Sequence, residues 1–188
     1  AWLIALARQE TACGNMCSWE RALFPMPLLP SQLDRAFDTL VWVVEPEGRA
    51  AQAVFYTDAS RCGGLCAPAA SHGWSFVARD RDGATLAAAH GTPPQWVQSV
   101  NAAETWALAQ AAQSSLAGSS FRSDCLGAVT TAQRGVAHAT SARQLCAEAW
   151  SIYFTAAGED AQPDLEGIPA HTSLEDVGEV ITAADRDG

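Results

Sequence analysis

The hydrophobic positions in the middle of this chain fall in short runs whose composition predicts three consecutive strands. Residues 53–57 are rich in β-branched and aromatic side chains, which is typical of a strand, and we expect this strand to end at Asp58. Two similar runs, residues 73–79 and 84–89, are separated by a segment that contains Asp82-Gly83, a strong hairpin signal. We therefore expect the second and third strands to pair as a hairpin.

The pattern changes to helical spacing in the second half of the chain. After Pro93-Pro94 the sequence predicts a helix over about residues 102–116, ended by Gly118. The elements expected after it are a short strand at 121–124, helices at about 126–133 and 142–157, and a last strand at 165–170. The order β-β-β-α-β-α-α-β predicts an α/β fold, a mixed five-stranded sheet flanked by helices, because a strand–helix–strand step places parallel strands together.

The first fifty residues have a different character. Pro25, Pro27 and Pro30 interrupt any helix, and the apolar run at residues 40–44 stops at the turn cluster Glu45-Pro46-Glu47-Gly48. We expect residues 1–50 to be a connector or the remnant of an upstream domain, and residues 51–188 to be the main domain. The length of 188 residues suits one such domain with an extension.

Charge narrows the set of functions. The formal net charge is -10, with 11 basic residues that are all Arg. Such a chain is a poor non-specific binder of phosphate backbones, because that binding depends on many cations. No apolar run approaches the roughly 20 residues that a membrane-spanning helix needs. A site built from carboxylates and a metal ion, or a groove with a few arginines, remains compatible with this composition.

The cysteines suggest a reducing compartment. Six cysteines in a chain of this length do not form a disulfide scaffold, and we expect an intracellular location. Two similarly spaced pairs, Cys13 with Cys17 and Cys62 with Cys66, would suit a four-thiolate zinc site. The alternative for the second pair is a Gly-rich loop beside the first strand.

Three carboxylates occupy positions at which a site can form. Asp58 and Asp124 follow strands, and sites in sheets with parallel strands form at the carboxyl ends of the strands. Glu104 shares a helical stripe with Leu108 and Ala112, so we expect it to point toward the sheet. Three converging carboxylates need a cation, and Mg²⁺ prefers such oxygen ligands.

Each carboxylate also has a purely structural interpretation. Asp58 would stabilise a turn, and Asp124 would be an ordinary polar strand end. For Glu104 the alternative is a capping box, with Asn101 as N-cap and Glu104 three residues later. The joint placement of the three residues on strand, helix and strand favours the metal site.

Four segments in order resemble the motifs of the ribonuclease H family, in particular the domains attached to reverse transcriptases of retroelements. The resemblance covers about residues 51–188. It is carried by Tyr56-Thr57-Asp58-Ala59-Ser60, by Asn101-Ala102-Ala103-Glu104-Thr105-Trp106-Ala107-Leu108, by Phe121-Arg122-Ser123-Asp124, and by Ile168-Pro169-Ala170-His171-Thr172-Ser173.

The resemblance implies a nuclease that hydrolyses the RNA strand of RNA–DNA hybrids with two divalent metal ions, Mg²⁺ or Mn²⁺. Asp58 would bridge the ions, and Glu104 and Asp124 would hold one each. His171 would assist product release or proton transfer. Recognition of the hybrid would use the 2′-hydroxyl groups. The resemblance also implies a polymerase-type domain upstream.

The chain departs from the family at its C-terminal end. A fourth carboxylate is expected after the histidine loop, and Asp185 and Asp187 are the only acidic residues in the last stretch, from residue 182. We expect the fourth ligand and the last segment to be missing from this chain, which would weaken the second metal position. Two alternatives therefore stay open: a non-catalytic module of the same fold, and a nuclease or integrase that acts on DNA.

Overall fold

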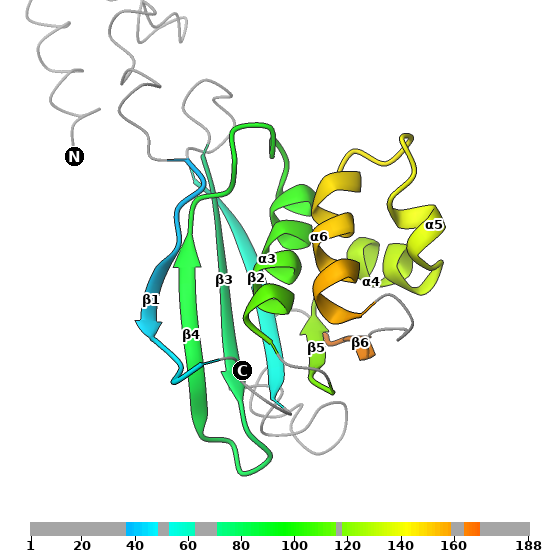
Figure 1. The fold of residues 1–188 in the computed structure, drawn as a ribbon. Coiled ribbons are helices and arrows are strands. Elements are labelled where there is room, and N and C mark those ends of the chain that lie inside the picture. The colour runs from blue at the N-terminus through cyan, green and yellow to red at the C-terminus, as the bar shows by residue number, and fades with distance from the viewer. Residues whose placement is uncertain (1–36, 49–52, 63–70, 116–117, 159–163, 170–188) are drawn as a thin grey trace, which may run out of the picture.

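The structure is a computed structural model, and it describes residues 37–48, 53–62, 71–115, 118–158 and 164–169. These residues form one mixed sheet with helices packed against it (Figure 1). The strands are β1 (Val41–Val44), β2 (Val54–Cys62), β3 (Ser71–Arg79), β4 (Thr85–Gly91), β5 (Ser120–Ser123) and β6 (Asp164–Gly167). The helices are α3 (Val100–Ser114), α4 (Leu126–Gln133), α5 (Val136–Ala139) and α6 (Ala147–Ala157).

The sheet has six strands in the order β1-β4-β3-β2-β5-β6. β2, β3 and β4 form the predicted antiparallel meander, whereas β5 and β6 run parallel to β2. In the β3–β4 hairpin, Asp80 Oδ1 accepts hydrogen bonds from the backbone of Asp82 and Ala84, and Gly83 adopts a φ of 84°. A positive φ suits glycine, which explains why Asp-Gly marked this turn.

The expected count of five strands was wrong by one. The additional strand is β1, which pairs antiparallel with β4 through Val41 and His90 and through Trp42 and Ala89. β1 lies in the part of the chain assigned to a connector, so the sheet extends to the N-terminal side of residue 50. The division of the chain near residue 50 otherwise stays a prediction.

Helix α3 lies against the middle of the sheet, and its start differs from the expected one. Ser99 is the N-cap, and its Oγ accepts a hydrogen bond of 3.2 Å from the backbone of Ala102. Asn101 therefore lies inside the helix and does not cap it, which removes the capping-box interpretation of Glu104. The helix ends at Ser114, two residues before the expected end at residue 116, and Ser115 is its C-cap.

The core fills the space between the sheet and helices α3 and α6. Phe55, Phe76 and Phe121 come from adjacent strands, and Tyr153 from α6 stacks edge-on against Phe121 with ring centroids 5.4 Å apart. The buried side of α3 is largely alanine: Ala102, Ala103, Ala107, Ala109, Ala111 and Ala112. Such short side chains allow the helix to lie close to the strands.

Other elements match the expectations with shifted ends. α6 begins at Ala147, five residues later than predicted, because turns occupy the preceding stretch, and the short helix α5 follows Gly135. None of the helices in the described part of the chain is long and apolar enough to cross a membrane. Cys13, Cys17 and Cys66 lie outside the described residues, so both interpretations of the cysteine pairs stay open.

Candidate metal centre

The sheet brings Asp58 and Asp124 together through the parallel pairing of β2 and β5. Thr57 is opposite Ser123, so Asp58 and Asp124 each directly follow one member of this pair along the chain. β5 ends at Ser123, whose Oγ accepts a hydrogen bond from the Cys125 backbone, whereas β2 continues to Cys62. The expectation that β2 ends at Asp58 was therefore wrong. Asp58 nevertheless lies at the carboxyl end of the β2–β5 pairing, because β5 stops there.

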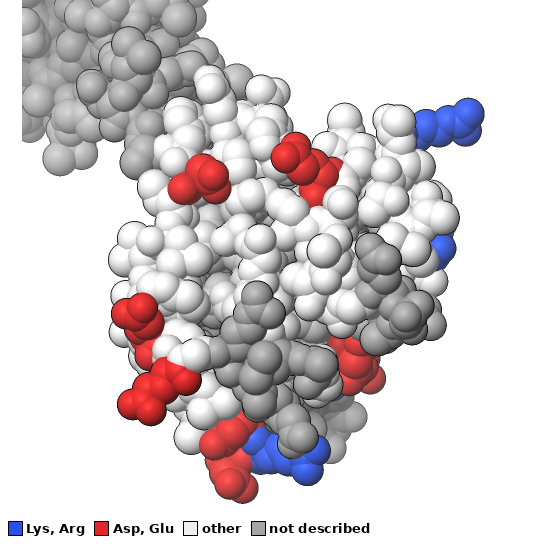
Figure 2. Space-filling view, in the orientation of Figure 1, with Lys and Arg blue, Asp and Glu red and all other residues white. Residues whose placement is uncertain are grey.

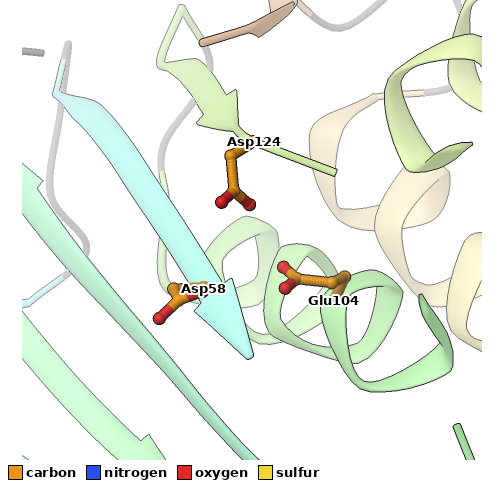
Figure 3. Close-up of side chains that lie close together, drawn as sticks. All are labelled: Asp58, Glu104 and Asp124. Atoms are coloured by element: carbon orange, nitrogen blue, oxygen red, sulfur yellow. The ribbon is translucent and has the colours of Figure 1, made fainter. Parts of the chain in front are cut away.

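Helix α3 supplies the third carboxylate. Glu104 lies in the second turn of α3 and points toward the two aspartates from the other side (Figure 3). One carboxylate oxygen from each of Asp58, Glu104 and Asp124 can be chosen so that all three lie within 4.8 Å of one another. The sequence thus identified three residues that the fold brings to one place.

Glu104 is buried, and its two oxygens have different environments. Only 5% of the residue is exposed. Oε1 accepts a hydrogen bond of 3.0 Å from the backbone N–H of Ala59 on β2, which ties the helix to the strand. Oε2 is buried without a hydrogen-bond partner in the described structure. A buried carboxylate oxygen without a partner is costly, so this atom suits a ligand that the protein itself does not provide.

The pKa of Glu104 also indicates a site for a proton or a cation. The pKa of Glu104 is raised to about 8, chiefly by burial; the hydrogen bond from Ala59 lowers it, and the charges of Asp124 and Asp58 contribute to the increase. The protein therefore favours a proton or a cation on this carboxylate. Because all three side chains are hard oxygen donors and two of them are exposed to solvent, the set fits a divalent cation such as Mg²⁺ that keeps part of its water shell.

Two neighbours support the site and were not singled out from the sequence as site residues. Asn101 lies three residues before Glu104 on α3, and its Oδ1 lies 2.7 Å from the Sγ of Cys125. This contact joins the start of α3 to the residue that follows Asp124. The available signal was the helical spacing of Asn101 and Glu104, which places both on one side of α3.

The roles of three other candidate residues stay predictions. His171, Asp185 and Asp187 fall outside the described residues.

Arg122 lies two residues before Asp124 and forms an ion pair of 3.1 Å with Glu166 on β6, so a bound phosphate would have to compete with this partner. On the face shown in Figure 2, acidic side chains are spread widely and basic ones are few. This distribution agrees with weak non-specific attraction to nucleic acid.

The order and pairing of the strands and helices identify the fold. The meander, the central helix and the two parallel strands that follow make up a ribonuclease H-like fold, which agrees with the sequence resemblance. The solved structure of a foamy viral protease-reverse transcriptase in complex with an RNA/DNA hybrid matches 79% of this chain, with a TM-score of 0.52 and 15% sequence identity.

The matched region is 21% of that viral protein, so this chain spans about a fifth of its length. The solution structure of the PFV RNase H domain is also similar, with a TM-score of 0.49, 13% identity, and coverage of 66% of this chain and 85% of that domain. No protein-family model matches the sequence, and no curated protein matches it.

Proposed function

We propose that this protein is a divalent-cation-dependent nuclease that hydrolyses the RNA strand of RNA–DNA hybrids. The observation that carries the proposal is the convergence of Asp58, Glu104 and Asp124 at the carboxyl end of the β2–β5 pairing in a ribonuclease H-like sheet. Glu104 Oε2 is buried there and has no hydrogen-bond partner among the described residues. The structurally similar foamy viral protein was solved with an RNA/DNA hybrid, which supports the choice of substrate.

Each of the three carboxylates would have its own role in binding the metal ions. Asp58 would bridge two Mg²⁺ or Mn²⁺ ions, Glu104 would bind one through Oε2, and Asp124 would bind the other. Bound ions supply an activated water for attack on the phosphodiester and neutralise the leaving 3′ oxygen. The hydrogen bond from Ala59 fixes the orientation of Glu104, so the carboxylate needs no rearrangement to bind.

Other parts of the proposal concern residues or partners beyond this centre. His171 would assist product release or proton transfer. Recognition of the hybrid would rely on 2′-hydroxyl groups, because the acidic surface offers little attraction to phosphates in general. The protein would act inside the cell, downstream of a polymerase-type domain.

A cleavage assay tests the proposal. The chain is incubated with an end-labelled RNA–DNA hybrid in Mg²⁺, in Mn²⁺ and in EDTA, with duplex DNA of the same sequence in parallel. We expect cation-dependent cleavage of the RNA strand that Asp58→Asn abolishes. The matched control is Asp82→Asn, the same change at an exposed hairpin position.

Two results would contradict the proposal. Equal or faster cleavage of duplex DNA would identify a DNA nuclease of the same fold. No cleavage with either cation, together with a melting temperature that Mg²⁺ does not change, would identify a non-catalytic module.

A further inference from the structure

The two edges of the sheet are protected very differently. β6 forms one edge and carries the exposed acids Asp164 and Glu166, which pair with Ser120 and Arg122 on β5. β1 forms the other edge, and its four residues, Val-Trp-Val-Val, include no charge and no proline (Figure 1). Exposed edge strands normally carry charges or prolines, which prevent other strands from pairing with them. The β1 edge is short and carries a bulge between Trp42 and Val44, but it lacks charges and prolines.

The β1 edge is also the most apolar part of the described surface. Five of the ten exposed large hydrophobic residues belong to one stretch of eight: Phe37, Leu40, Val41, Val43 and Val44. The pairing with β4 shifts between Trp42 and Val44, so Val43 has no opposite residue and is 68% exposed. A contiguous apolar strip of this kind indicates an interaction surface.

The strip is held in a fixed conformation. The Trp42 ring packs edge-on against Phe76 in the core, with centroids 5.8 Å apart. At the start of the strand, the backbone N–H of Thr39 donates to the carbonyl of Thr92, and the hydroxyl groups of these two residues lie 2.8 Å apart. An edge that is already ordered adds a strand at a lower entropic cost.

The charges beside the strip indicate what kind of strand fits. Asp38 precedes β1, Glu45 and Glu47 follow it, and all three are exposed, while residues 37–48 contain no basic residue. In an antiparallel pair of two copies with Val41 opposite Val44, Asp38 would lie opposite Glu47, and like charges directly opposite one another are unfavourable. The net charge of -10 on each copy adds to this repulsion. A strand with basic residues at both ends would instead be complementary.

We propose that β1 is a docking edge for an extended segment of another protein, apolar at its centre and basic at both ends, which adds to the sheet as a seventh strand. Backbone hydrogen bonds would provide affinity, and Val41 and Val43 would select apolar side chains. The acids at the two ends of β1 would fix the register. This proposal is independent of the metal centre.

The test uses a fluorescent peptide about ten residues long, a length typical of a long strand. Val and Thr alternate in its centre and Lys residues stand at both ends. Fluorescence anisotropy is measured in EDTA with the full chain. We expect saturable binding that is at least about tenfold weaker for a peptide with Glu in place of Lys, and for an N-methylated peptide that cannot form backbone hydrogen bonds.

Variants locate the binding edge. Val43→Lys is expected to weaken binding about tenfold. It places a positively charged side chain opposite the apolar centre of the peptide and near its basic ends. Leu145→Lys is the matched control at a position that is 95% exposed on another part of the surface, and it should leave binding unchanged. A thermal melt shows whether each variant is folded, and Val41→Lys provides a second variant at the same edge.

Three results of the peptide experiments would overturn the proposal. They are the absence of binding by the Lys-ended peptide, equal binding of the Lys-ended and Glu-ended peptides, and binding that neither Val43→Lys nor Val41→Lys weakens. A dimer in sedimentation velocity that Val43→Lys dissociates would also overturn it, because the occupant would then be a second copy of this chain.

Discussion

Replacing Glu104 with glutamine is expected to stabilise the protein in the absence of a divalent cation. The raised pKa of about 8, against an ordinary value of 4.5, means that the folded protein holds a proton that the unfolded chain releases. Between these two values the folded state binds more protons, so stability falls as the pH rises, by about 1.4 kcal/mol per pH unit from this group. Glutamine cannot ionise, and its carbonyl oxygen can still accept the hydrogen bond from Ala59.

The magnitude follows from the width of that pH window. A span of roughly 3.5 pH units corresponds to about 5 kcal/mol as an upper limit at pH 8. Relaxation and water near the exposed aspartates reduce this figure, and we expect Glu104→Gln to exceed the wild type by about 2 kcal/mol at pH 8 in EDTA. The difference should disappear well below pH 4.5, where both states of the wild type are protonated.

Urea unfolding in EDTA at several pH values measures this difference, with Glu148→Gln as the control because Glu148 is an exposed glutamate on α6. Added Mg²⁺ should make the wild type more stable than Glu104→Gln. A cation at about 100 times its dissociation constant stabilises the wild type by about 2.7 kcal/mol. The variant, which lacks one ligand charge, should gain much less. A Glu104→Gln protein that is no more stable than the wild type at pH 8, or a difference that does not depend on pH, would refute the reasoning.

Two further predictions concern the structure around the site. Gly91→Ala should destabilise the protein by at least about 2 kcal/mol in urea unfolding, because the added Cβ would overlap the backbone of Thr39, whereas Gly73→Ala at an ordinary contact should cost far less. Ser99→Ala should lower the unfolding free energy by about 1 kcal/mol through loss of the cap on Ala102, and Ser99→Asp should retain the wild-type value; equal stability of the two variants would contradict the capping role.

The parts of the fold that follow from local sequence were predicted well. The β3–β4 hairpin depends on one turn with Asp80 and Gly83, and the chemistry of that turn is visible in four residues. The placement of Glu104 toward the sheet follows from helical spacing with Leu108, which is fully buried. The convergence of the three carboxylates followed from the order of strands and helix, because parallel strands have their carboxyl ends at the same end of the sheet.

The misjudged elements depend on contacts between distant residues. The composition of Val41–Val44, three valines and a tryptophan, is typical of a strand, but the turn cluster after it led to its assignment to a connector. Its place in the sheet depends on pairing with β4, about fifty residues later. β2 continues past Asp58 because Ser60 pairs with Gly73 on β3, although its own sequence turns polar there. The cap at Ser99 was missed because Asn101 matched the same capping pattern two residues later.

The alanines on the buried side of α3 have a consequence for the metal centre. They set the spacing between helix and sheet, and this spacing lets Glu104 reach the backbone of Ala59 while its second oxygen faces the aspartates. A larger side chain at Ala107 or Ala111, one or two turns from Glu104, would push the helix outward without touching a ligand. We therefore expect cation affinity at this candidate centre to be set partly at a distance, by residues whose contribution is their small size.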